Sequence, residues 1–96
     1  IFFKKMDATL ISNIIKSSVF PYSGAFFVHK KKKFILSDKI KILRNYFGTP
    51  GRIIKRGRKN LIVICKSNAI LLEDLYYNKK KIFNINKYFK LSDDLS

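Results

Sequence analysis

The chain reads GTPGRIIKRGRKNLIVICKSNAILLEDL over residues 48–75, and the fold class follows from this stretch. Short runs rich in Ile, Val and Leu alternate in it with polar groups and glycines. Such runs, bounded by turn signals, are typical of β-strands in antiparallel sheets. We therefore predict three strands here, at residues 52–55, 61–65 and 69–75.

Turn signals mark the ends of these strands. In residues 48–51, Pro50 suits position i+1 of a type II turn, and Gly51 suits position i+2, where φ is positive. The polar run Arg56–Asn60 predicts a hairpin tip, and Lys66–Asn68 predicts a second turn. The stretch is therefore expected to form consecutive hairpins.

Nearer the N-terminus the pattern becomes helical. Asp7 is a suitable N-cap, so a helix is predicted over about residues 8–17. Pro21 prevents the helix from continuing. One face of this helix carries four aliphatic side chains, those of Leu10, Ile11, Ile14 and Ile15.

Further strands are predicted between this helix and the stretch. After a turn that ends at Gly24, residues 25–29 form a strand, and Lys30–Lys33 form a charged connection. A second strand begins at residues 34–36, and residues 39–43 then alternate charged and apolar side chains at period two.

One helix followed by five or six short strands predicts a mainly β domain with an N-terminal helix. The expected architecture is a small OB-like β-barrel over about residues 25–89, with residues 82–89 adding a short last strand. An SH3-like barrel and an open meander are the alternatives. With 96 residues, the chain is expected to form a single domain over residues 1–96.

The formal net charge is +15, from 21 lysines and arginines against six acids. Such a charge favours partners that carry phosphate or carboxylate groups. The alternative is a lysine-rich composition of the kind that an AT-rich genome produces, with the charge on a solvated surface.

The residues needed for catalysis are scarce. His29, the sole histidine, is expected to be structural or exposed, and the sole cysteine, Cys65, is expected to be a buried small side chain. We predict no catalytic residue, no metal site, no bound cofactor and no membrane partner. A cytoplasmic, reducing compartment fits this composition.

The segment Ile14–Phe26, IIKSSVFPYSGAF, resembles a signature of the C-terminal domain of formyltransferases. That family usually shows Ile-Arg-Ala, a spacer, and Pro-Trp/Tyr-Pro-Gly-Ala-Phe. Here Lys16 replaces the usual Arg, Ser17 the Ala and Ser23 the second Pro. Lysine lacks the planar fork of arginine, so a bidentate clamp at Lys16 is in doubt.

Later elements are similar to the family in order and spacing. Pro50-Gly51-Arg52-Ile53-Ile54 resembles its Pro-Gly turn and Ile-rich strand, and Ala69–Leu75 resembles its strand ending in Leu-Leu-Glu. The resemblance spans about residues 11–90. It marks four residues as structural: Pro21, Gly24, Pro50 and Gly51.

The resemblance implies an OB-like barrel appended to a Rossmann-like catalytic domain, which this chain does not contain. That catalytic domain binds 10-formyltetrahydrofolate, so this domain is not expected to be a catalyst by itself. The implied role is structural support or binding of the amino acceptor, either methionyl-tRNA or a nucleotide-linked sugar. The spacing from Ile15 to Pro21, and Tyr22 in place of Trp, favour the nucleotide-sugar enzymes, whereas the charge suits tRNA.

Basic residues at expected turns and ends are the candidate acceptor contacts: Lys16, Lys30, Lys31, Lys32, Lys33, Arg52, Arg56, Arg58 and Lys59. Two other functions stay open. A free-standing RNA-binding barrel would stack bases on Tyr46, Phe47, Tyr76, Tyr77 and Tyr88, although core filling is the favoured role of these rings. A dimerisation module would pair through an exposed apolar patch, and a homodimer is therefore possible.

Overall fold

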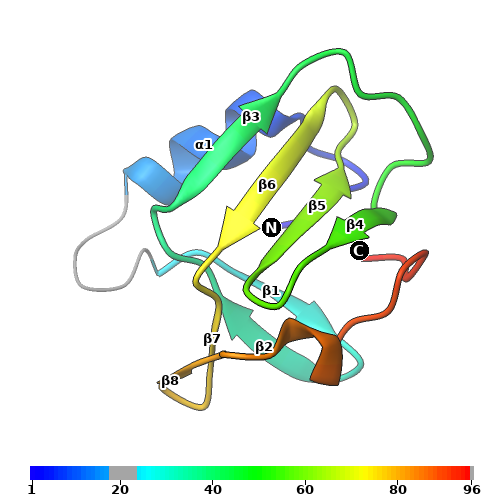
Figure 1. The fold of residues 1–96 in the computed structure, drawn as a ribbon. Coiled ribbons are helices and arrows are strands. Elements are labelled where there is room, and N and C mark those ends of the chain that lie inside the picture. Colours follow the sequence, from blue (N-terminus) through cyan, green and yellow to red (C-terminus); the bar gives the residue numbers. More distant parts are fainter. Residues whose placement is uncertain (18–23, 96) are drawn as a thin grey trace.

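We describe residues 1–17 and 24–95 of a computed structural model of the chain. Two four-stranded antiparallel sheets and one α-helix surround a single hydrophobic core. Figure 1 shows α1 running beside β3, at the edge of one sheet, while β1, β2 and β7 lie across the lower end of that sheet.

The helix α1 (Ala8–Lys16) begins at Asp7, whose carboxylate accepts a hydrogen bond from the Leu10 backbone N–H at 2.8 Å. This is the predicted N-cap. The buried face differs from the prediction: Ile11 and Ile15 are buried together with Ala8 and Ser12, whereas Leu10 is exposed. The buried positions follow the i, i+3, i+4, i+7 spacing of a helix that rests on a sheet.

The first sheet has the order β1-β2-β7-β8, with β1 at Phe26–His29, β2 at Lys32–Ile35, β7 at Tyr76–Tyr77 and β8 at Lys80–Lys81. The predicted charged connection at 30–33 is too long. His29 pairs with Lys32, so the loop is only Lys30-Lys31, and both residues have positive φ, at 50° and 66°. Two such residues form the tight type I′ turn that matches strand twist.

The second sheet has the order β3-β6-β5-β4, with β3 at Ile40–Leu43, β6 at Ala69–Glu73, β5 at Asn60–Ile64 and β4 at Ile53–Arg56. These strands confirm the predicted ones to within one or two residues. The Pro50 turn is also confirmed. The Arg52 N–H donates to the Thr49 carbonyl at 3.1 Å, and Gly51 has φ +89°, as a type II turn requires.

The predicted strand at 82–89 is wrong. Its residues form a bend followed by the 3₁₀ helix η1 (Ile85–Lys87), because the Asn84 side chain accepts a hydrogen bond from the Asn86 N–H and caps that turn. Residues 92–95 then run along β4. The Ile53 N–H donates to the Asp93 carbonyl at 2.9 Å, and the Leu95 N–H donates to the Gly51 carbonyl at 2.6 Å.

The core lies between the sheets and α1 and includes a cluster of aromatic rings. Phe27 stacks on Phe34 at 5.5 Å between centroids, and Phe89 contacts Phe34 at 4.8 Å. The mainly β class with one short helix is confirmed. Among the described residues the two strand ladders do not join, so backbone hydrogen bonds do not close the predicted OB-like barrel. No helix in this part of the chain is long and apolar enough to cross a membrane.

Candidate functional site

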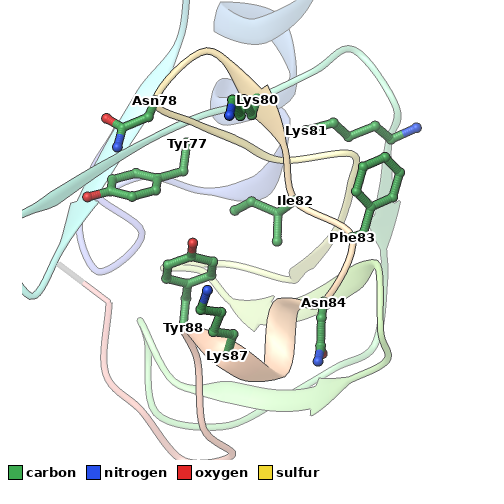
Figure 2. A pocket seen from close by; sticks show the side chains of 9 residues that line it. All are labelled: Tyr77, Asn78, Lys80, Lys81, Ile82, Phe83, Asn84, Lys87 and Tyr88. Carbon is green, nitrogen blue, oxygen red and sulfur yellow. The ribbon is translucent and has the colours of Figure 1, made fainter.

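Two adjacent hollows open on the side of the molecule formed by η1 and the hairpins of the first sheet. The larger, here called the tyrosine hollow, has a volume of about 360 Å³. Its lining comes from β7, β8 and the segment that follows: Tyr77, Asn78, Lys80, Lys81, Ile82, Phe83, Asn84, Lys87 and Tyr88. Figure 2 shows Tyr77 and Tyr88 on one side, Phe83 on the other and Ile82 between them.

The second hollow, here called the histidine hollow, has a volume of about 310 Å³. The β1–β2 hairpin meets η1 there, and the lining is His29, Lys30, Lys32, Phe34, Asn86, Lys87, Tyr88, Phe89 and Lys90. Lys87 and Tyr88 line both hollows, so the two form one continuous surface with Tyr88 at the divide.

Six lysines line this surface, and we call them the lysine face: Lys30, Lys32, Lys80, Lys81, Lys87 and Lys90. Among the described residues, neither lining includes an aspartate or a glutamate. Lysine ammonium groups around a concave surface attract phosphate oxygens, and the concavity concentrates their field. The surface is therefore suited to an anionic ligand with more than one charge.

Local sequence explains how the tyrosine hollow forms. Asn78 and Lys79 have φ of 51° and 64°, so β7 and β8 are joined by a two-residue turn. The helix η1 forms one wall of the hollow, through Lys87. The N–H of Ile85, the first residue of η1, donates to the Arg58 carbonyl at 2.7 Å. This bond joins η1 to the tip of the β4–β5 hairpin.

The two tyrosines are anchored on the core. Tyr77 and Tyr88 lie 5.4 Å apart between ring centroids, and each contacts Phe34, at 5.4 and 5.6 Å. Both rings are half-buried. The predicted core-filling role is therefore correct for one side of each ring, while the other side faces the hollow. It is wrong for Tyr46 and Phe47, which are 41% and 90% exposed.

Asp74 secures the hairpin that carries these residues. Its carboxylate, which is almost buried, pairs with the Lys39 ammonium at 3.0 Å and the Lys81 ammonium at 3.2 Å. Burial alone would raise the pKa of Asp74, but hydrogen bonds from the two lysines, together with their charges, lower it below its usual value. The clamp links the start of β3 to β8.

His29 has a partner that its local sequence does not reveal. Its Nε2 lies 3.3 Å from a carboxylate oxygen of Asp93, and its ring stacks on Phe89 at 5.3 Å. Partial burial alone would raise the pKa of Asp93, but the Lys90 backbone N–H, the charge of Lys30 and the bond to His29 lower it. His29 is 8% exposed, so its predicted structural role agrees with this placement.

Part of the predicted lysine run belongs to the lysine face. Because side chains alternate along a strand, Lys32 and Phe34 share one face of β2, and both line the histidine hollow. Lys33 points to the opposite side, where its ammonium lies 4.3 Å from the centroid of the Phe26 ring. Lys31 is exposed at the turn between β1 and β2.

The predicted arginines divide into two groups. Arg52 pairs with Asp94 at 3.6 Å, and half-buried Arg56 donates to the Phe89 carbonyl, so both hold the C-terminal segment. Arg58 and Lys59 are exposed at the hairpin tip beside the tyrosine hollow, with the Lys59 ammonium 6.0 Å from the Phe83 centroid. Lys16, in the last turn of α1, is exposed and is not among the residues that line the two hollows.

The residues marked as structural also have definite places. Gly24 has φ +76° and Gly51 has φ +89°, and half-buried Pro50 precedes Gly51 in the type II turn. Pro21 lies outside the described residues. Cys65 is buried as predicted, and burial raises the pKa of its thiol to about 12, which keeps it protonated at neutral pH.

Sequence reasoning named Tyr77 and Tyr88 only for the alternative RNA-binding function, and it missed the lysines contributed by β8 and η1, above all Lys80 and Lys87. Lys87 was missed because residues 82–89 were assigned to a strand. Asn84, a good cap residue, was the available signal for η1. Within residues 1–17 and 24–95, no three His, Cys, Asp or Glu side chains lie close enough together to hold a metal ion.

An apolar patch lies on the outer side of the first sheet. Phe2, Phe26 and Val28 are 54%, 39% and 49% exposed, and together with Ile1 and Phe27 they line a hollow of about 240 Å³. Exposed aromatic side chains gathered in one place commonly mark a contact surface.

Comparison with protein families gives a match. The model of the formyl transferase C-terminal domain family matches residues 1–92. No curated protein and no solved structure matches the chain. Since the family model covers nearly the whole chain, the expected resemblance is confirmed. The protein belongs to the formyl transferase C-terminal domain family.

Proposed function

We propose that this domain holds the tRNA acceptor of a formyltransferase, through phosphate contacts with the lysine face. Membership in the family implies a catalytic partner domain, to which the acceptor must be presented. The observation that carries the proposal is the continuous surface of two hollows, lined by six lysines. Phosphate contacts dominate the affinity of proteins for nucleic acids.

The tRNA proposal differs from the acceptor that the sequence favoured. The spacing and the Tyr22 position that favoured a nucleotide sugar lie largely in residues 18–23, outside the described part of the chain. A nucleotide sugar carries only two phosphates. The lysine face extends over the β1–β2 hairpin, the β7–β8 hairpin and η1, which suits a polyanion better than a compact diphosphate.

We propose that the one-carbon donor binds the catalytic domain. Edges of a pterin ring present several N–H donors, for which a carboxylate is the matching partner. Among the described residues, neither hollow is lined by one. The residues that line the two hollows therefore do not match the N–H edge of 10-formyltetrahydrofolate, and we assign it no contact with them.

The test is a titration of the domain with tRNA at several salt concentrations. In one variant Lys30, Lys87 and Lys90 become Gln. A matched control changes three exposed lysines elsewhere, Lys41, Lys55 and Lys66, to Gln. Each lost phosphate contact reduces the slope of log affinity against log salt by about 0.9. The lysine-face variant should lose up to about 3 units of slope, and the control much less.

Two results would reject the proposal. If both triple variants lose the same affinity, tRNA is attracted only by the total charge of the domain, and the lysine face has no special role. If a nucleoside diphosphate sugar displaces tRNA from the wild-type domain at equal phosphate concentration, the acceptor is the sugar nucleotide.

The apolar patch supports a second proposed role, contact with the catalytic domain. In a C-terminal domain the chain joins its partner domain at the N-terminal side, and the patch includes Ile1 and Phe2. Exposed Phe2, Phe26 and Val28 would be covered by such a contact.

This role is tested by comparing the same variant in the complete enzyme and in the isolated domain. Phe2→Ser combined with Val28→Ser should lower the unfolding temperature of the complete enzyme, while the isolated domain should change little because both side chains are exposed. Equal effects in both contexts would contradict the contact. Concentration-dependent dimers of the isolated wild-type domain, lost in the variant, would assign the patch to a second copy instead.

A further inference from the structure

The tyrosine hollow has more aromatic surface than phosphate binding requires. Tyr77, Tyr88 and Phe83 line it together with Ile82, and Figure 2 shows Ile82 between the two tyrosines on one side and Phe83 on the other. Phe83 is 67% exposed, in a domain whose core already encloses many aromatic side chains. An exposed ring beside half-buried tyrosines offers planar apolar surface that a ligand would remove from water.

The polar groups around these rings are donors and amides. Lysines 80, 81 and 87 lie in the lining, and the Lys59 ammonium is 6.0 Å from the Phe83 centroid. Asn78 and Asn84 add amide groups. The Asn84 oxygen already accepts from the Asn86 N–H, which leaves its NH₂ group as a donor for a ligand.

The Lys87 ammonium also lies 5.8 Å from the Tyr88 centroid, and rings with cations and amides nearby match a nucleotide whose base is unpaired. Every base has a planar face that can stack on an aromatic side chain, whereas in a duplex these faces are covered by neighbouring bases. A volume of about 360 Å³ falls in the range of small-ligand sites, about 300–1,000 Å³.

We propose that the tyrosine hollow binds an unpaired nucleobase of the acceptor RNA, stacked against Phe83 and Tyr88, with lysines of the rim on the flanking phosphates. The proposal rests on the proposed function and adds to it the part of the RNA that is bound, a loop or a single-stranded end. Phosphate contacts then supply affinity, and the hollow selects single-stranded segments.

The experiment compares two short single-stranded oligonucleotides of equal length and charge, an oligouridylate and an abasic sugar-phosphate strand, in titrations monitored by tyrosine fluorescence. Wild-type domain should bind the base-bearing strand roughly tenfold more tightly. Phe83→Ala should remove this preference and leave abasic binding unchanged. Phe47→Ala, which removes another exposed phenylalanine outside the hollow, should preserve it.

The substitutions are chosen so that folding does not confuse the result, because Phe83 and Phe47 are both largely exposed. Equal affinity of the wild-type domain for the two strands, with tRNA still bound through the lysine face, would overturn the nucleobase site alone. Failure to bind either strand or tRNA would overturn both this site and the proposed function. A preference that survives Phe83→Ala would place the base elsewhere and reject the hollow.

Discussion

Gly51 lies where the C-terminal segment crosses the Pro50 turn. Its φ is +89°, and a Cβ atom there would overlap the Leu95 carbonyl oxygen and the Lys4 side chain. Gly24 has a similar φ of +76°, but a Cβ there would meet none of the described atoms within 4 Å. Substitutions at the two glycines therefore distinguish the cost of backbone strain, present at both, from the cost of steric overlap, present at Gly51.

Gly51→Ala is expected to destabilise the domain more than Gly24→Ala. The left-handed conformation costs an alanine roughly 1–2 kcal/mol at either position. At Gly51 the overlap with the Leu95 backbone adds to that cost, because the hydrogen bond from the Leu95 N–H to the Gly51 carbonyl holds Leu95 in place. Urea unfolding of both variants measures the difference. Equal midpoints would mean that the C-terminal segment moves away at no cost.

Asp74→Asn should remove an acid-sensitive part of the stability. The pKa of Asp74 is lowered in the folded chain, so its contribution is complete above its unfolded pKa, about 3.9, and is lost as pH falls through the lower folded value. Asparagine tolerates the φ of +54° at this position. The loss at neutral pH should be about 1 kcal/mol, since the lysine partners are partly exposed.

Unfolding midpoints measured from pH 7 to pH 3 check this expectation. The wild-type midpoint should approach that of Asp74→Asn as the pH falls. Asp38→Asn, at an exposed aspartate, serves as the control and should follow the wild-type curve. If Asp74→Asn keeps the full acid dependence of the wild type, the clamp does not contribute to it.

At the level of elements, local signals were sufficient for the helix and for β1 and β3–β6. Asp7 identified the helix start, and the Pro50-Gly51 turn identified the start of β4. The short hairpins were harder, because left-handed turns at Lys30-Lys31 and Asn78-Lys79 contain no glycine. Lysine is a poor signal for such a turn, so Lys30–Lys33 were assigned to a charged connection and residues 76–81 to no element.

The candidate site depends on contacts between distant segments. The lysine face joins the first hairpin, around residue 30, to η1 and Lys90, and His29 meets Asp93 across 64 positions. No local pattern predicts such contacts from a single sequence. The predicted barrel ended at residue 89 for the same reason, although residues 92–95 are hydrogen-bonded along β4.

Leu95 tests how much the C-terminal segment contributes. It is fully buried in the core, and its N–H is bonded to Gly51. Leu95→Ala should cost about 2–3 kcal/mol, as expected for a buried leucine near a chain end. Leu91→Ala, at a side chain that is 54% exposed, should change stability by less than about 0.5 kcal/mol. Equal effects of the two would show that the segment is not part of the cooperative unit.

The whole molecule combines a small size with a large charge. Its extents are 32 × 29 × 21 Å, and its net charge is +15. At about 0.01 M salt the screening length is roughly 30 Å, comparable to the molecule, whereas at about 0.15 M it is roughly 8 Å. In dilute buffer each lysine therefore repels nearly all the others, and this repulsion opposes the compact state.

Sodium chloride should therefore stabilise the folded domain. Screening also weakens the ion pairs of Asp74 and Asp94, but six acids cannot balance 21 cations, so the reduced repulsion dominates. Urea midpoints should rise from about 0.01 M to about 0.15 M salt. The Lys41/Lys55/Lys66→Gln variant, with three fewer charges, should be more stable in dilute buffer and respond less to salt. A urea midpoint that falls with salt would contradict this expectation. It would show that the ion pairs contribute more to stability than the repulsion among lysines removes, because the surface lysines lie too far apart to disturb the fold.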